Sequence, residues 1–340
     1  MKRHSQDIKI GILTHLSRSG STLLARMLDD YDDICVTTEG EFPLELFGVK
    51  SYAPILFQDH NQIQAYLDTV LKQTRVASWK LSDATILESC QSMGYPISGP
   101  ALVQSILAVY RNMYKPKAKI VIYKACPFMP WHISESMQHF PEVKFLHLLR
   151  DPRAVYHSQK NSIDPFTQKP YSNSALKTAL DWKKATDLAL VDAATMEMRF
   201  ENLVDDPTPI IKSILQFLAL ENEAKSHNEI PFMGRMEQVD QELHQEINLA
   251  PDPKKNLAWQ TSLSARELKV IDSLLHKRMI DNGYTPSVSS PSSFFQVYLF
   301  MGILRESFIT LLRRSRRFSK QMLSNPQHLT RKIKLKMRHG

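Results

Sequence analysis

The sequence predicts an α/β fold in which helices cover both faces of a parallel sheet. Short apolar runs typical of buried strands alternate along the chain with segments whose apolar residues recur at three- and four-residue spacing. Such alternation favours parallel strands joined by helical crossovers. Beyond the alternating part, the sequence becomes apolar and then basic. We therefore expect a folded domain over 1–288 and a helical tail over 289–340 that is apolar and then basic.

The net charge comes from the tail. The chain has 43 Lys and Arg residues against 35 Asp and Glu residues, a net charge of +8. Ten basic residues and no acidic residue lie from Arg313 onward, so the preceding residues carry a net charge of −2. The folded domain thus lacks the charge of a nucleic-acid-binding domain. Three cysteines without C-x-x-C spacing predict neither a zinc site nor a disulfide framework.

A polar turn joins the first predicted strand, 8–14, to the first predicted helix, 23–28. Backbone N–H groups at a helix start and the positive end of the helix dipole attract anions, and side-chain donors strengthen that attraction. The turn therefore predicts a phosphate or sulfate site. Unlike the P-loop of nucleotide triphosphatases, the sequence has no lysine directly after the last glycine. The candidate anion-binding residues are Arg18, Ser19, Gly20, Ser21 and Thr22.

Charged residues follow the next two predicted strands. Glu39 and Glu41 follow a strand over 34–38, and Lys124 follows a strand over 119–123. Ligands of open parallel sheets bind at the carboxyl ends of the strands, so these side chains are candidates for chemistry. The alternatives are solvated loop acids and a lysine that extends from the strand end into water.

Between these strands, residues 44–100 are irregular and rich in aromatic residues and proline, with a helical piece over 62–73. We interpret this region as a cover over the crevice that contributes to acceptor binding. A core helix is expected over 101–113, where apolar residues recur at helical spacing.

A second anion site is predicted after the strand over 143–149. Arg150 follows that strand, Asp151 is suited to cap the next helix, and Pro152 suits its first turn. Ser158 lies two turns along the same helix, so Arg150 and Ser158 could hold one anion together. The remaining expected elements are a short helix over 130–140, a polar lid over 163–174, a helix over 175–194, a strand over 196–200, a helix over 210–220, a mostly surface segment over 221–253 and a helix over 265–279.

Four segments together resemble sulfotransferases that use 3′-phosphoadenosine-5′-phosphosulfate (PAPS). They are residues 18–24, residues 149–158, residues 199–207, and Trp259 with Gly283-Tyr284. The resemblance extends over about residues 8–286 and is strongest in the first two segments. It implies a P-loop-like sulfotransferase fold with PAPS as co-substrate and no metal requirement.

The resemblance also implies roles for individual residues. The loop from Arg18 to Thr22 would bind the 5′-phosphosulfate, and Arg150 with Ser158 would bind the 3′-phosphate. Lys255 and Asn256 lie where the family closes a loop on the nucleotide.

The spacing of two charged residues resembles the protein-tyrosine and Golgi carbohydrate branch of the family. Glu39 follows Arg18 by 21 residues, and Lys124 precedes Arg150 by 26 residues. This implies that Glu39 is the general base, a role it can fill if burial raises its pKa, and that Lys124 stabilises the leaving group. The tyrosine enzymes differ in carrying an arginine where this chain has Glu41.

The acceptor is expected to offer a hydroxyl on a carbohydrate, a lipid-linked molecule or a small molecule. Two other functions stay open: a kinase-like nucleotide-dependent enzyme, and a non-catalytic nucleotide-binding protein at a membrane. Four histidines are rival bases, although each is better suited to packing or capping: His15, His60, His147 and His157.

The tail contains an apolar stretch over 294–304, which continues over 308–312 before the basic residues. Arg305 and Glu306 interrupt it, so we expect a helix in the membrane interface rather than a spanning helix. The alternatives are a helix docked on the body or in a homodimer contact. RNA binding is less favoured because aromatic residues are not interleaved with the distal basic residues. The N-terminus has no apolar leader, so we expect a cytoplasmic protein, peripherally associated with a membrane.

Overall fold

The structure is a computed structural model, and its described part covers most of the chain. The described residues are 8–49, 55–125, 127, 129–140, 142–164, 167–189, 194–220, 230–243 and 252–288, with 295–297, 299–306, 308 and 312 in the tail. Within them, the side chains of residues 73, 188, 189, 239 and 255 lie outside the description.

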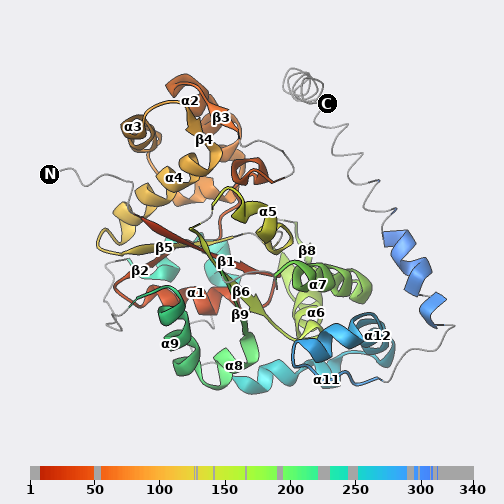
Figure 1. Cartoon of the computed structure of the whole chain (residues 1–340). Helices are drawn as coiled ribbons and strands as arrows, with labels where there is room; N and C mark the ends of the chain where they lie inside the picture. The colour runs from red at the N-terminus through yellow and green to blue at the C-terminus, as the bar shows by residue number, and fades with distance from the viewer. Residues whose placement is uncertain are drawn as a thin grey trace.

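A parallel sheet of five strands forms the centre of the molecule (Figure 1), in the order β2-β5-β1-β6-β9. All four pairings between neighbouring strands are parallel. The α/β fold predicted from the alternating pattern is therefore confirmed. The strands are β1 (Lys9–His15), β2 (Ile34–Val36), β5 (Ile120–Lys124), β6 (Lys144–Leu149) and β9 (Thr195–Arg199).

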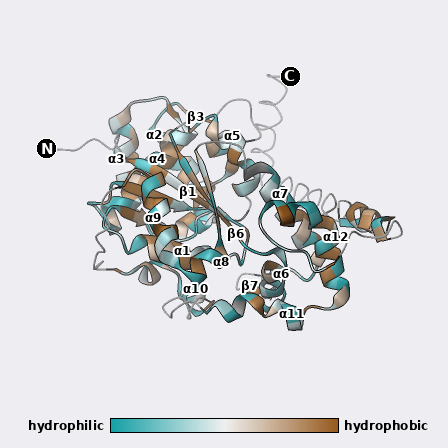
Figure 2. Cartoon of the chain, turned by 60° about the horizontal axis from the view of Figure 1, so that its bottom comes forward, coloured by the Kyte–Doolittle hydropathy of each residue, from teal (hydrophilic) through white to brown (hydrophobic). Residues whose placement is uncertain are grey.

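The strands bury residues on both faces because successive side chains point to opposite sides. In β1, Ile12 joins the core on one face and Leu13 joins the core on the other. The face of Leu13 packs against α1 (Ser21–Asp29), α8 (Phe200–Asp205) and α9 (Pro207–Phe217). Hydrophobic colour accordingly concentrates in the central strands between layers of helices (Figure 2).

The face of Ile12 is covered by the region that was expected to be irregular. The core helix expected over 101–113 follows this region and is α4 (Gly99–Tyr114), whose N-cap Ser98 accepts a hydrogen bond from the backbone N–H of Ala101. Trp79, from this region, is 1% exposed and packs edge-on against Tyr110 at 4.9 Å between ring centroids. The region is thus part of the core as well as a cover. Its other elements are η2 (Leu44–Phe47), β3 (Leu56–Phe57), α2 (His60–Thr69), η3 (Leu71–Gln73), η4 (Arg75–Trp79), α3 (Asp83–Met93) and β4 (Ile97–Ser98).

A third core lies beside β6, built around the buried Trp182. Its helices are α6 (Pro152–Asn161), α7 (Ala175–Ala189), α11 (Trp259–Ser262) and α12 (Ala265–Asp281). Between α6 and α7, the expected polar lid forms a short antiparallel pair, β7 (Ile163–Asp164) with β8 (Lys169–Pro170). The connection after β5 forms η5 (Met129–His132) and α5 (Ile133–Met137).

The segment expected to lie mostly on the surface is exposed or half-buried over most of its described part, as expected, but it also holds one buried ion pair. Arg235, in η6 (Phe232–Arg235), contacts Asp29 of α1 at 2.8 Å, and both side chains are almost fully buried. A polar sequence gives little sign of such burial because a paired charge can enter a core where an unpaired one cannot. The rest of the described segment forms α10 (Gln238–Leu243) and η8 (Pro253–Leu257).

None of the helices in the described ranges is both long and apolar enough to cross a membrane.

Candidate active site

An open cavity of about 1380 Å³ lies at the carboxyl ends of the strands. Its size exceeds the usual range for one small ligand, about 300–1,000 Å³, so it has room for two substrates side by side. The first predicted loop, the second predicted anion site and Glu39 all line it. Its lining includes His15, Arg18, Gly20, Ser21, Thr22, Glu39, Arg75, Arg150, His157, Ser158, Tyr171 and Asn256.

The loop between β1 and α1 is tightly folded. Arg18 and Gly20 both adopt left-handed backbone conformations, with φ of 72° and 87°. At Gly20 a Cβ atom would lie 2.1 Å from the ring of Phe200, so only glycine fits. Helix α1 begins directly afterwards at Ser21, and its N-terminus therefore opens into the cavity. Ser19, Ser21 and Thr22 are buried around this turn.

The two sites predicted separately are joined through Arg150. Its Nη1 donates to the backbone oxygen of Arg18 at 3.0 Å, and its Nη2 donates to Oδ1 of Asn256 at 3.1 Å. Arg18 reaches the other way, with its Nε donating to Oγ of Ser158 at 3.2 Å. The loop, helix α6 and η8 thus meet at one place.

The two arginines at this place have neutral hydrogen-bond partners. Across the described ranges, neither Arg18 nor Arg150 forms an ion pair with a carboxylate, and the buried Nε of Arg150 has no hydrogen-bond partner. Burial lowers the pKa of both guanidinium groups, which shows how poorly the surroundings solvate their charge. Two desolvated cations beside a helix N-terminus favour a bound anion.

Glu39 lies in the same cavity and is held by two cations. Its Oε2 accepts from Nζ of Lys124 at 2.7 Å, and its Oε1 pairs with Nη1 of Arg75 at 3.1 Å. Backbone pairing of Gly40 with Ala125 aligns the two strand ends that carry Glu39 and Lys124. Lys124 does not extend into water, because its side chain is only 3% exposed.

The ion pairs determine the ionisation of Glu39. Burial by itself raises the pKa of Glu39, but the charges of Lys124 and Arg75 outweigh burial and lower the pKa to about 2. The condition attached to Glu39 as a base, a pKa raised by burial, is therefore not met while both cations lie beside it. At neutral pH Glu39 is a carboxylate whose proton affinity is suppressed while both cations remain beside it.

Two of the four histidines line the cavity, His15 and His157. Burial, together with the nearby Lys124 ammonium, lowers the pKa of His15 to about 4, so its ring is neutral at neutral pH. Its Nδ1 lies 3.1 Å from the backbone oxygen of Leu16, and its buried Nε2 has no partner among the described atoms. His147 instead packs in the sheet, with Nδ1 2.9 Å from Oγ1 of Thr14, and His60 is exposed on α2.

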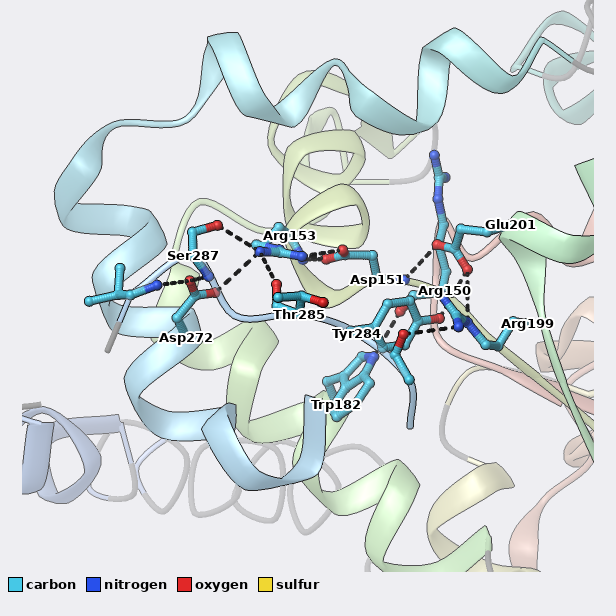
Figure 3. A network of polar contacts seen from close by, with 12 residues as sticks. Arg150, Asp151, Arg153, Trp182, Arg199, Glu201, Asp272, Tyr284, Thr285 and Ser287 are labelled. Carbon is cyan, nitrogen blue, oxygen red and sulfur yellow. Dashed lines mark hydrogen bonds and ion pairs between the residues drawn. The ribbon is translucent and has the colours of Figure 1, made fainter. Parts of the chain in front are cut away.

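The residues that follow Arg150 connect α6 to the end of the domain (Figure 3). Asp151 caps α6, as predicted, and pairs with Arg153 at 2.7 Å. Arg153 also donates to the backbone oxygen of Thr285 at 3.0 Å, and the buried Asp272 accepts from the N–H of Ser287 at 2.6 Å. These charges support the domain rather than facing the cavity.

The backbone around Arg150 is fixed by its neighbours, also visible in Figure 3. The indole N–H of Trp182 donates to the backbone oxygen of Arg150 at 2.9 Å. Glu201 accepts from the N–H of Asp151 at 2.9 Å and from the hydroxyl of Tyr284 at 3.0 Å. Glu201 belongs to the third segment of the resemblance, residues 199–207, and Tyr284 belongs to the fourth. Both segments therefore help to hold the backbone next to Arg150.

Two cavity residues were missed from the sequence, Arg75 and Tyr171. Arg75 lies in the irregular region, where no periodicity marked it, and Tyr171 lies 5.7 Å below the guanidinium of Arg18, measured to the ring centroid. Lys255 falls in η8, and its side chain lies outside the described part of the chain.

The fold and the cavity define a class: a parallel α/β protein with two arginines beside the N-terminus of its first helix. Residues 12–224 match the family described as "Sulfotransferase family". The match covers more than half of the 340 residues, and the chain belongs to this family.

Solved structures share the fold. The sulfotransferase domain of the Synechococcus PCC 7002 olefin synthase has a TM-score of 0.50 at 17% identity, over 82% of this chain and 96% of that one. The sulfotransferase domain from the curacin biosynthetic pathway has a TM-score of 0.51 at 16% identity, over 84% of this chain and 99% of that one. Identities this low support the fold alone.

Curated relatives match over a shorter stretch. The omega-hydroxy-beta-dihydromenaquinone-9 sulfotransferase Stf3 of Mycobacterium bovis is 27% identical over 129 residues, which cover 34% of this chain and 33% of that protein. The protein of the same name from Mycobacterium tuberculosis gives the same match. The matched part thus spans about a third of the length of these relatives.

Proposed function

We propose that this protein is a PAPS-dependent sulfotransferase that transfers a sulfuryl group to a hydroxyl of its acceptor. The observation that carries the proposal is the pair of desolvated arginines, Arg18 and Arg150, held by neutral oxygens beside the N-terminus of α1. Two cations in one cavity suit a donor with two anionic groups. Family membership supports the same reaction.

We assign the 5′-phosphosulfate to the loop from Arg18 to Thr22. There the α1 N-terminus and the loop hydroxyls can donate to its oxygens. We assign the 3′-phosphate to Arg150, Ser158 and Asn256, where the unpartnered Nε of Arg150 supplies a further donor.

In the transfer step, the acceptor oxygen forms a bond to sulfur as the bond from sulfur to the bridging phosphate oxygen breaks. The bridging oxygen leaves with the electron pair, and Lys124 can stabilise the charge that develops there. A Lys124 ammonium that turns toward this oxygen leaves Glu39 with one cation fewer. The pKa of Glu39 then rises, so Glu39 can accept the acceptor's proton.

His15 is the rival base because its neutral ring lines the same cavity. Its Nε2 can accept a proton without first losing an ion pair. Substitution of each residue distinguishes the two candidates.

As the acceptor group we propose a hydroxyl on a carbohydrate, a lipid-linked molecule or a small molecule. The name of the mycobacterial relatives, an omega-hydroxy-beta-dihydromenaquinone-9 sulfotransferase, supports a hydroxyl acceptor. The relation to the protein-tyrosine and Golgi carbohydrate branch stays a hypothesis based on the spacing of Glu39 and Lys124.

The test compares adenosine 3′,5′-bisphosphate with ATP plus magnesium by their effect on the unfolding temperature. The bisphosphate is expected to stabilise the wild type, by about 2.7 kcal/mol at a hundredfold excess over Kd, and to do so better than ATP. Arg150→Ala and Ser158→Ala should lose this preference. Arg26→Ala, in α1 but outside the cavity, is the matched control. Preference for ATP with magnesium would favour the kinase-like function instead.

A further inference from the structure

The described part of the tail is a helix that docks on the body along one side. Leu299 is 6% exposed and belongs to the third core with residues of α7 and α12. A Cβ atom on Gly302 would lie 2.7 Å from Leu176, and Glu306 accepts from Oγ of Ser174 at 3.3 Å. The ammonium of Lys269 lies 4.5 Å from the ring centroid of Phe295. Residues 295, 299, 302 and 306 thus form one seam.

The opposite side of this helix is apolar and faces solvent. An α-helix turns by about 100° per residue. The mean direction of its exposed apolar side chains is therefore roughly half a turn around the helix axis from that of the seam. Half of the large apolar side chains that are exposed in the described structure belong to the tail, and the others are scattered over the surface. We call five of these six tail residues the outer stripe: Val297, Phe300, Met301, Leu304 and Phe308, each at least 49% exposed.

Charge follows the outer stripe directly. Arg305 is exposed on the same helix, and Arg313 begins a segment with ten basic residues and no acidic one. An apolar stripe next to positive charge complements a surface that is apolar inside and anionic outside, which is the interface of an anionic bilayer. A symmetric second copy fits less well, because it would bring two such basic segments together.

We propose that the outer stripe inserts into the interface of an anionic lipid bilayer while the basic segment contacts the headgroups. The seam holds the helix against α7 and α12, so the folded domain is carried to the bilayer with it. Figure 1 shows this helix at the edge of the molecule, after α12. This proposal depends neither on the assignment of the donor site nor on the transfer reaction. Membrane binding and the proposed function can therefore be refuted independently.

Vesicle flotation with the full chain tests the proposal, using phosphatidylcholine with and without phosphatidylglycerol. The wild type should bind the anionic vesicles, and added salt should weaken that binding. The double variant Phe300→Ser with Phe308→Ser should bind at least about tenfold more weakly. Replacing Arg313, Arg314, Arg316 and Arg317 by serine should weaken binding by a factor of ten or more, roughly, and remove most of the salt dependence.

The control variant replaces Met113 and Ile280 by serine, since both are exposed apolar residues of the body. It should bind vesicles as the wild type does. Unchanged unfolding temperatures and bisphosphate binding in the stripe variant would show that the domain is intact. Failure of the wild type to bind anionic vesicles overturns the proposal. So does a wild-type dimer by light scattering that the stripe variant converts to a monomer, because the stripe would then cover a second copy.

Discussion

Two groups of cations at the cavity are held in different ways. We call Arg18 and Arg150 the donor end, and Glu39 with Lys124 and Arg75 the acid end. At the donor end, Arg18 and Arg150 bond to a hydroxyl, a backbone carbonyl and an amide oxygen, all neutral. At the acid end, Lys124 and Arg75 pair with the Glu39 carboxylate. The donor end therefore has positive charge ready for an anion. At the acid end both cations already contact an anion, and Glu39 can act as a base only when one of them moves away.

The comparison predicts the largest effect for a change at the acid end. Glu39→Gln should lower kcat by about 10²- to 10⁴-fold, because it removes the base, while donor affinity stays close to that of the wild type. Steady-state transfer of sulfate from PAPS to a hydroxyl acceptor measures the loss. His15→Gln serves as the counterpart. If His15→Gln abolished turnover and Glu39→Gln retained it, the base would be His15.

Acid should destabilise the protein through His15 at the same end. The folded protein keeps His15 neutral down to a pKa of about 4, whereas the unfolded chain takes up a proton near the ordinary value of 6.5. The unfolded state thus binds more protons in this window, and the free energy of unfolding falls as pH falls from 6.5 to 4, by up to about 3 kcal/mol. Urea unfolding at several pH values should show a shallower fall for His15→Gln. An equal slope in both proteins would contradict the assigned shift.

At the donor end, Arg150→Ala should weaken binding of adenosine 3′,5′-bisphosphate by about 10- to 100-fold. This is the cost expected for losing a charge-assisted hydrogen bond of roughly 1.5–3 kcal/mol. Calorimetric titration measures it. Arg26→Ala should leave the affinity unchanged, and an equal loss in that control would point to a general charge effect.

The smallest expected effect concerns Arg75, which holds Glu39 from the irregular region. Arg75→Gln removes one of the two cations that depress the pKa of Glu39, so that pKa should rise toward its ordinary value. The acid limb of the pH–kcat profile should move to higher pH, with donor affinity little changed. An unmoved acid limb would mean that Arg75 does not control the base.

The sequence predicted the donor end better than the acid end, for a physical reason. Arg18 to Thr22 and Arg150 to Ser158 each lie within one strand–turn–helix unit, where local patterns determine the geometry. The acid end joins β2, β5 and the irregular region, so its ion pairs depend on the assembled fold. Arg75 therefore left no local sign in the sequence, and the lowering of the Glu39 pKa by Lys124 and Arg75 together was not predicted.

The same distinction explains the tail and the segment before η8. Apolar spacing predicted a helix around residues 294–304, but only the packing of Leu299 and Gly302 distinguishes its docked seam from its outer stripe. The burial of Arg235 could not be predicted from its polar segment, because its partner Asp29 lies 206 positions away in the chain.

The most direct test of the division into two ends is calorimetric titration of adenosine 3′,5′-bisphosphate into three proteins: the wild type, Arg150→Ala and Glu39→Gln. We predict that Glu39→Gln binds as the wild type does, whereas Arg150→Ala binds about 10- to 100-fold more weakly. Undiminished binding by Arg150→Ala, or an equal loss in both variants, would contradict the account of a donor end that is separate from the acid end.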